Sequence, residues 1–210
     1  MNALIDRVDD GVRRACEETK SPRAVVCGYS MGGRVAALYA VRHSERIAAL
    51  VLESAGLGCQ THEDQCAMEA RNDEWAQRIE ESLPRFVDWW EQLPLFATQQ
   101  NADADARERQ RQARLANDPQ DLARQLRGAG VHCMPLEEDV MAALAGLKVP
   151  VHYIVGAKDA KYCAVADRLP ASISVHTVDA GHNVHMENPR MFEKIWTEKI
   201  LASLKGDRSA

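Results

Sequence analysis

A serine in a glycine-flanked turn is the clearest chemical feature of this sequence. Residues 28–32, GYSMG, match the pattern G-x-S-x-G, which places a nucleophilic serine on a sharp turn between a strand and a helix. An apolar, β-branched run typical of a buried strand precedes the turn at 24–28, and an alanine-rich helical stretch follows at 32–43. This context predicts that Ser30 is an exposed nucleophile or base, with the backbone N–H of Met31 as one donor to a developing oxyanion.

A serine hydroxyl needs partners before it can act. It is a weak nucleophile or base until a histidine takes its proton, and that histidine must be oriented by an acid. Asp159 and His182 each follow an expected strand, the first in GAKD and the second in DAGHN. The order serine, acid, histidine along the chain is that of the α/β-hydrolase fold. We therefore predict that Ser30, His182 and Asp159 form a catalytic triad.

Each member of this triad has an alternative. A phosphate-binding loop would need a lysine beside Ser30, and the sequence has none there. His185 is the other candidate base, but the glycine directly before His182 permits a tight loop that carries the imidazole over the sheet edge. Asp179 is the other candidate acid, but it lies only three residues before His182, on the same loop, and is badly placed to reach the far ring nitrogen.

Short apolar runs alternate with helical patterns on both sides of the serine motif. Strands are expected at 24–28, 47–53, 149–156 and 173–179, and helices at 3–19, 32–43 and 189–204. Such alternation predicts a parallel sheet with helices on both faces. The serine turn and the order of the triad residues are both typical of one such fold, so the sequence indicates an α/β-hydrolase fold.

The middle of the chain, residues 59–146, has a different pattern. It contains tryptophans, many charged residues and helical periodicity, but no convincing strand. Ser82 and Asp118, each followed closely by a proline, are expected to begin two of its helices. We therefore predict a core formed by residues 1–58 and 147–210, with residues 59–146 inserted as a helical lid over the carboxyl edge of the sheet.

Composition and charge exclude several classes of function. The 26 basic and 31 acidic residues give a formal net charge of −5, which provides no long-range attraction for nucleic acid or for an anionic membrane surface. No stretch approaches the roughly 18 consecutive apolar residues of a membrane span, and acidic residues near the N-terminus argue against a signal peptide. Six cysteines without a C-x-x-C pair indicate free thiols in a reducing compartment and no metal site. We expect a cytoplasmic protein, and its sequence does not specify an oligomeric state.

Longer blocks of the sequence resemble one family. GYSMGGRVAALYA and LVLESAGLG are similar to the 2-succinyl-6-hydroxy-2,4-cyclohexadiene-1-carboxylate synthases of menaquinone biosynthesis, a branch of the α/β-hydrolase superfamily. The similarity continues in order through EARNDEWAQRIE, FVDWWEQLPLF, RQARLANDPQDLARQLRGAG, LKVPVHYIVGAKDAKY and VDAGHNVHMENP. Generic esterases share the serine turn and the histidine loop but not the helical blocks, so several blocks in one order favour the synthase family.

This resemblance implies a lyase. The family eliminates pyruvate from a succinyl-enolpyruvyl-hydroxycyclohexene carboxylate to give 2-succinyl-6-hydroxy-2,4-cyclohexadiene-1-carboxylate. Ser30 with His182 would then act as a base that removes a substrate proton, while the oxyanion site holds the developing enolate. The reaction needs no cofactor. Its substrate is a small anion with several carboxylates, which planar guanidinium groups bind in a bidentate manner.

By position, the resemblance assigns six further residues to the substrate site. Arg34, Arg71 and Arg114 correspond to carboxylate-binding groups, and Tyr29, Trp89 and Trp90 to pocket-lining aromatic residues. Arg34 lies in the first turn of the nucleophile helix, which places its guanidinium near the pocket. The alternative for Arg71 and Arg114 is that they lie on a solvent-exposed face of the lid. The alternative for the two tryptophans is that they pack in the core of the lid.

The resemblance departs from the family before the serine turn. Only one helix and one strand are expected ahead of Ser30, whereas an α/β-hydrolase normally has a further block of about 50 or more residues there. That block includes a His-Gly loop that supplies the second oxyanion N–H. We therefore expect an N-terminally truncated sheet. A serine carboxylic-ester hydrolase, which the triad alone allows, and an inactive remnant, which the absent loop favours, stay open as alternative functions.

Overall fold

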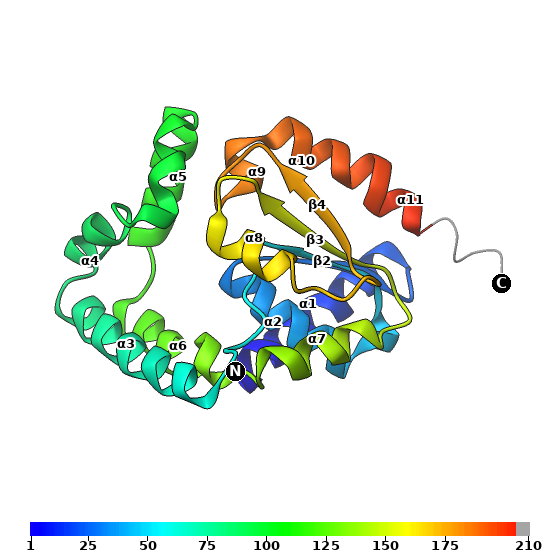
Figure 1. Ribbon diagram of the computed structural model, residues 1–210, viewed down its shortest axis with the longest axis horizontal. Coiled ribbons are helices and arrows are strands. Elements are labelled where there is room, and N and C mark those ends of the chain that lie inside the picture. The colour runs from blue at the N-terminus through cyan, green and yellow to red at the C-terminus, as the bar shows by residue number, and fades with distance from the viewer. Residues whose placement is uncertain (205–210) are drawn as a thin grey trace.

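A parallel sheet lies at the centre of the computed structural model, which describes residues 1–204 (Figure 1). Within that range, four strands form one sheet in the spatial order β1 (Ala24–Tyr29), β2 (Ile47–Glu53), β3 (Val151–Gly156) and β4 (Ser174–Val178). Every neighbouring pair is parallel, and Leu52 pairs with both Gly28 and Tyr153. The predicted parallel α/β architecture is therefore confirmed, and the carboxyl ends of the strands meet at one edge.

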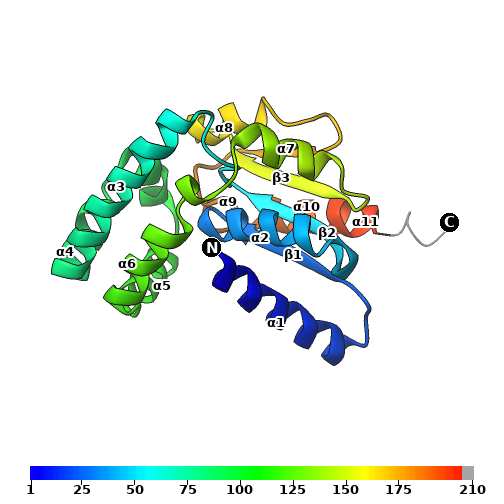
Figure 2. The ribbon, with the colours of Figure 1, turned by 90° about the horizontal axis from the view of Figure 1, so that it is seen from below.

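Helices cover both faces of this sheet. One face packs against α1 (Asn2–Thr19), α2 (Met31–Arg42), α7 (Glu137–Ala145) and α8 (Ala160–Ala166). The opposite face packs against α9 (Val184–Glu187), α10 (Pro189–Ile195), the π-helical turn Trp196–Ile200 and α11 (Leu201–Ser203). Figure 2 shows α1 lying along α2 on the first face. Leu50 and Leu52 of β2 face one layer and Val51 the other, as the two-residue period of a strand requires.

A group of helices, which we call the helical lobe, lies beyond the carboxyl edge in both views (Figures 1 and 2). It comprises α3 (His62–Glu81), α4 (Leu83–Trp90), the 3₁₀ segment η2 (Pro94–Asn101), α5 (Ala104–Leu115) and α6 (Pro119–Ala129). Ser82 and Asp118 accept hydrogen bonds from the amides of the first turns of α4 and α6, as N-caps do. The lobe has an apolar cluster of its own, which includes Ile79, Phe86 and Val87.

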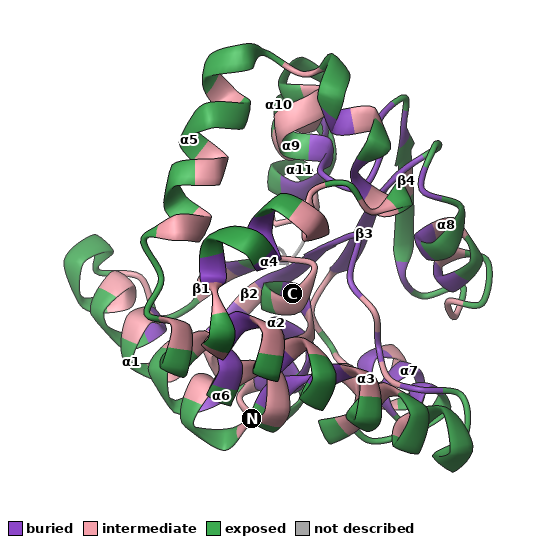
Figure 3. Cartoon of the chain, turned by 90° about the vertical axis from the view of Figure 1, so that its left-hand side faces the viewer, coloured by how far each residue is buried: buried purple, intermediate pink, exposed green. Residues whose placement is uncertain are grey.

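Burial distinguishes the two central strands, β2 and β3, from the outer helices (Figure 3). The six residues of β3 are all buried, whereas α5 has no buried residue. No helix in residues 1–204 is long and apolar enough to cross a membrane. The six cysteines are all free thiols.

The structure differs from the sequence expectations at two places. Helix α7 falls inside the expected lid range of 59–146, but Val140 and Leu144 bury it against α2 in the core cluster. Strand β3 begins at Val151 instead of 149, since Pro150 has no N–H for a strand ladder. The last six residues of the expected core range, 205–210, lie outside the described residues.

Candidate active site

The turn between β1 and α2 holds Ser30 in a strained conformation. Its φ of 49° lies in the left-handed region, which residues other than glycine rarely adopt. Two glycines allow strand and helix to approach here. A Cβ added to Gly28 would lie 2.5 Å from the carbonyl oxygen of Gly32, and one added to Gly33 would lie 2.8 Å from the carbonyl oxygen of Gly28. The turn therefore presents the Ser30 hydroxyl at the carboxyl edge of the sheet.

The structure brings the three predicted catalytic residues into contact. Nε2 of His182 lies 3.0 Å from Oγ of Ser30, and Nδ1 of His182 lies 2.7 Å from Oδ2 of Asp159. Asp159 follows β3 and His182 follows β4, so two neighbouring strand ends deliver them. Both side chains are 1% exposed. This geometry lets the histidine accept the serine proton while the buried carboxylate fixes the ring orientation.

The two rival residues have other partners. Nδ1 of His185 lies 2.7 Å from Oε2 of Glu53, a carboxylate that is 1% exposed at the end of β2. Asp179 pairs with Lys158 at 2.8 Å on the surface. The structure thus places His182, and not His185, beside Ser30, and Asp159, and not Asp179, behind the histidine.

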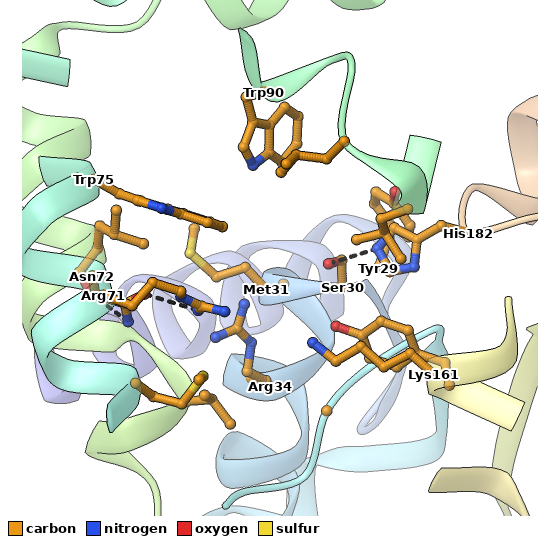
Figure 4. A pocket seen from close by; sticks show the side chains of 18 of the residues that line it. Tyr29, Ser30, Met31, Arg34, Arg71, Asn72, Trp75, Trp90, Lys161 and His182 are labelled. Atoms are coloured by element: carbon orange, nitrogen blue, oxygen red, sulfur yellow. Dashed lines mark hydrogen bonds between the residues drawn. The ribbon is translucent and has the colours of Figure 1, made fainter. Parts of the chain in front are cut away.

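A cavity of about 980 Å³ lies between the triad and the helical lobe (Figure 4). Its core side includes Tyr29, Ser30, Met31, Arg34, Lys161 and Tyr162, and its lobe side includes Arg71, Asn72, Trp75, Trp90, Phe96 and Arg114. Such a volume fits a ring compound with polar substituents. Because Met31 is the first residue of α2, no preceding helical turn offers an acceptor to its amide, which suits the predicted role as an oxyanion donor.

Three arginines line this cavity, as the resemblance implied. Arg34 and Arg71 have no carboxylate at salt-bridge distance among the described residues, and Nε of Arg71 is buried without a hydrogen-bond partner there. Removal from water lowers the pKa of both guanidinium groups from the usual arginine value. Arg114 differs, since its Nη1 lies 2.6 Å from Oε1 of Glu91. The site therefore presents two uncompensated guanidinium groups.

The two adjacent tryptophans have different surroundings. Trp90 lines the cavity, under the guanidinium of Arg114 at 4.8 Å. Trp89 instead packs inside the lobe, with its ring 5.6 Å from that of Trp75 and 3.7 Å from the guanidinium of Arg78. Trp89 is not among the residues that line the cavity. The implied pocket role of Trp89 is therefore corrected to lobe packing.

The sequence reasoning missed several cavity residues, among them Trp75, Lys161 and Tyr162. Trp75 lies one helical turn after Arg71, with the guanidinium 4.4 Å from its ring. Lys161 and Tyr162 begin α8, and the Tyr162 ring lies 4.7 Å from that of His182. The sequence did contain a signal for Lys161 and Tyr162, because they follow Asp159, the predicted triad acid, within three residues.

The lobe also touches the histidine loop directly. The Phe96 ring lies 5.9 Å from the His182 ring. In the same 3₁₀ segment, Thr98 lies against Gly181 so closely that a Cβ there would overlap its hydroxyl. Position 181 therefore requires glycine, which has no Cβ, for this contact to form.

Comparison with known proteins identifies the family of this chain. The family described as serine aminopeptidase, S33, matches residues 1–183. A putative 2-succinyl-6-hydroxy-2,4-cyclohexadiene-1-carboxylate synthase of Bacillus subtilis (strain 168) is 37% identical over 187 residues, which are 87% of this chain and 67% of that protein. The chain belongs to this synthase family within the serine aminopeptidase S33 group. The resemblance found in the sequence is thereby confirmed.

Other members of the synthase family give the same result. The synthase of Klebsiella pneumoniae is 34% identical over 165 residues, or 77% of this chain and 62% of its own length. This chain thus spans about two thirds of the length of the curated synthases it matches. The solved structure of MenH from S. aureus superposes with a TM-score of 0.83 at 29% identity, covering 98% of this chain and 76% of that one.

Proposed function

We propose that this chain carries out the synthase reaction, in which pyruvate is eliminated from a succinyl-enolpyruvyl-hydroxycyclohexene carboxylate to give 2-succinyl-6-hydroxy-2,4-cyclohexadiene-1-carboxylate. The observation that carries the proposal is the pair Arg34 and Arg71 in the cavity of Ser30, without a carboxylate partner in the described chain. A neutral ester would leave these two charges uncompensated. A substrate with several carboxylates supplies planar, bidentate partners for them.

In this mechanism the triad acts as a base. His182 takes the Ser30 proton, and the serine oxygen removes a proton from the substrate carbon next to the succinyl carbonyl. The electron pair moves onto the carbonyl oxygen, where the Met31 amide and the N-terminal end of α2 stabilise the enolate. Return of that pair breaks the carbon–oxygen bond to the enolpyruvyl group. This group leaves with a proton from His182 and becomes pyruvate.

The test compares an anionic with a neutral substrate. We expect Arg34→Ala to lower kcat/KM for the succinyl-enolpyruvyl substrate by about ten- to a hundredfold, the value of one charge-assisted contact. Hydrolysis of 4-nitrophenyl acetate should stay unchanged, because it has no carboxylate at that position. Arg85→Ala, on the exposed surface of α4, is the matched control.

Two outcomes would contradict the proposal. Equal effects of Arg34→Ala on both substrates, with faster turnover of the ester, would identify a serine carboxylic-ester hydrolase. The fold is compatible with this alternative, because a carboxylesterase structure from Nitrososphaera gargenis superposes on this chain with a TM-score of 0.72 at 18% identity. Absence of turnover of both substrates by the unmodified chain would identify a remnant without catalytic activity.

A further inference from the structure

Lys161 is a cationic side chain of the cavity to which the proposed mechanism gives no role. It lies in the first turn of α8, two residues after Asp159. Figure 4 shows its ammonium group pointing towards Arg34, whose guanidinium in turn points towards that of Arg71. The three cations come from α8, α2 and α3, so three separate elements direct positive charge into one part of the cavity.

This cluster has no acidic counterpart in the described chain. No carboxylate of residues 1–204 lies at salt-bridge distance from Lys161. Two acids do line the same cavity, but each is already bonded elsewhere. Asp64 accepts hydrogen bonds from Thr61 at the start of α3, and Glu137 pairs with Arg168 at 2.8 Å.

Asp159, the acid of the triad, also has other partners and does not pair with Lys161. Asp159 is hydrogen-bonded to His182 at 2.7 Å and to the amide of Tyr162. The nearby Lys158, in contrast, forms an ion pair with Asp179. Lys161, like Arg34 and Arg71, is therefore directed into the cavity without a carboxylate partner among the described residues.

Such an arrangement is electrostatically unfavourable without a bound anion. Lys161 keeps an exposed surface in the open cavity, but partial removal from water lowers its pKa, and the charges of Arg71 and Arg34 lower it further. Like charges in a partly buried space repel one another and favour loss of a proton. An anion of matching charge would remove this repulsion, so the cavity has the electrostatics of a polyanion site.

We propose that Lys161 completes, with Arg34 and Arg71, a three-cation subsite that binds two carboxylates of one substrate, and that Lys161 sets the preference for a dicarboxylate over a monocarboxylate. The inference rests on the proposed function, because that substrate carries a ring carboxylate and a succinyl carboxylate. The two guanidinium groups, which point towards each other, share one carboxylate. The compact ammonium of Lys161 then binds the second as a point charge.

Equilibrium binding of two probes tests this subsite. The monocarboxylate 4-oxo-4-phenylbutanoate has a succinyl group on a plain ring, and 2-(3-carboxypropanoyl)benzoate adds one ring carboxylate beside it. By calorimetry, the unmodified chain should bind the dicarboxylate about tenfold or more tightly than the monocarboxylate, as expected for one charge-assisted contact. Lys161→Met, which keeps the length of the side chain, should abolish this preference.

Two further variants complete the experiment. Lys161→Arg keeps the charge and should keep the preference. Lys158→Met removes a nearby surface lysine, which is 55% exposed and paired with Asp179, and should change neither binding nor preference. If Lys161→Met folds and still prefers the dicarboxylate as the unmodified chain does, the subsite is wrong.

The two proposals fail separately. A chain that distinguishes the two probes through Lys161 but releases no pyruvate would support the subsite and contradict the synthase reaction. A chain that releases pyruvate while Lys161→Met keeps its KM for the substrate and its full probe preference would contradict only the subsite.

Discussion

Glu187 holds the loop of His182 from both sides. Its Oε2 accepts a hydrogen bond from the amide of Gly181 at 2.7 Å, and its Oε1 accepts one from the amide of Asn183 at 3.2 Å. One carboxylate thus fixes the backbone immediately before and after His182. The histidine side chain is left to contact Asp159 and Ser30.

Replacing Glu187 should therefore affect the chemical step. We expect Glu187→Ala to lower kcat for pyruvate release by about a hundredfold while KM changes little, because a base displaced by about 1 Å loses that much rate. Glu187→Gln keeps one acceptor oxygen and should recover part of the loss. Glu193→Ala, at an exposed position of α10, is the control. A change in KM alone would show that the loop does not depend on this carboxylate.

Ser30→Ala should abolish turnover, because it removes the oxygen that takes the substrate proton. Losses of triad members run to several orders of magnitude, so a variant that keeps more than about a tenth of the activity would contradict the assigned role. Pyruvate release is the measurement. Ser172→Ala, on the surface before β4, should behave like the unmodified chain.

The two adjacent tryptophans should give different results. Trp90→Ala should raise KM by about three- to tenfold, because it removes an aromatic cavity wall whose ring lies 4.1 Å from that of Phe96. Trp89→Ala should lower the free energy of unfolding by about 2 kcal/mol or more, because its ring packs within the lobe. Substrate kinetics and thermal melting of both variants separate the roles, and a shared phenotype would count against this division.

Stability should fall as the solution becomes mildly acidic, through His152. Nδ1 of this buried histidine lies 3.0 Å from Nε2 of His176, and its Nε2 lies 3.1 Å from Oγ of Ser203. Burial, with the nearby His176, lowers the pKa of His152 from 6.5 to about 4. The unfolded chain therefore takes up this proton between pH 6.5 and 4, where the folded chain does not, and the stability present above pH 6.5 is lost progressively towards pH 4.

Denaturant unfolding at two pH values measures this effect. Between pH 7.5 and 5.0 the contribution of His152 to the free energy of unfolding should fall by about 2 kcal/mol. His152→Gln should lose most of that difference, whereas His62→Gln, at an exposed site, should retain it. Equal pH dependence in all three proteins would assign the acid sensitivity to other groups.

The triad could be predicted from the sequence because the fold leaves it little freedom. Ser30, Asp159 and His182 each follow a strand, and parallel strands place their carboxyl ends at one edge. The chain order then identifies which strand end supplies which group. The strands themselves were predictable because short apolar runs in a doubly covered sheet carry a strong local signal.

The cavity side of the lobe was harder to predict. Whether Trp89 or Trp90 faces the substrate depends on the rotation of α4 about its axis, which the packing of Trp89 on Trp75 decides. Helix α7 gave a similar difficulty, because its apolar residues show that one face is buried but not which partner covers it. Local periodicity reports the existence of a buried face, and only tertiary contacts select its neighbour.

The contact of Thr98 with Gly181 has a consequence for exchanging parts between relatives. A lobe grafted from another synthase brings its own residue to the position of Thr98, while the recipient keeps its own histidine loop. Any side chain at position 181 would push the 3₁₀ segment outwards and carry the Phe96 ring away from His182. A grafted lobe therefore keeps its contact with the histidine loop only where glycine stands at position 181 and a residue no larger than threonine stands at position 98.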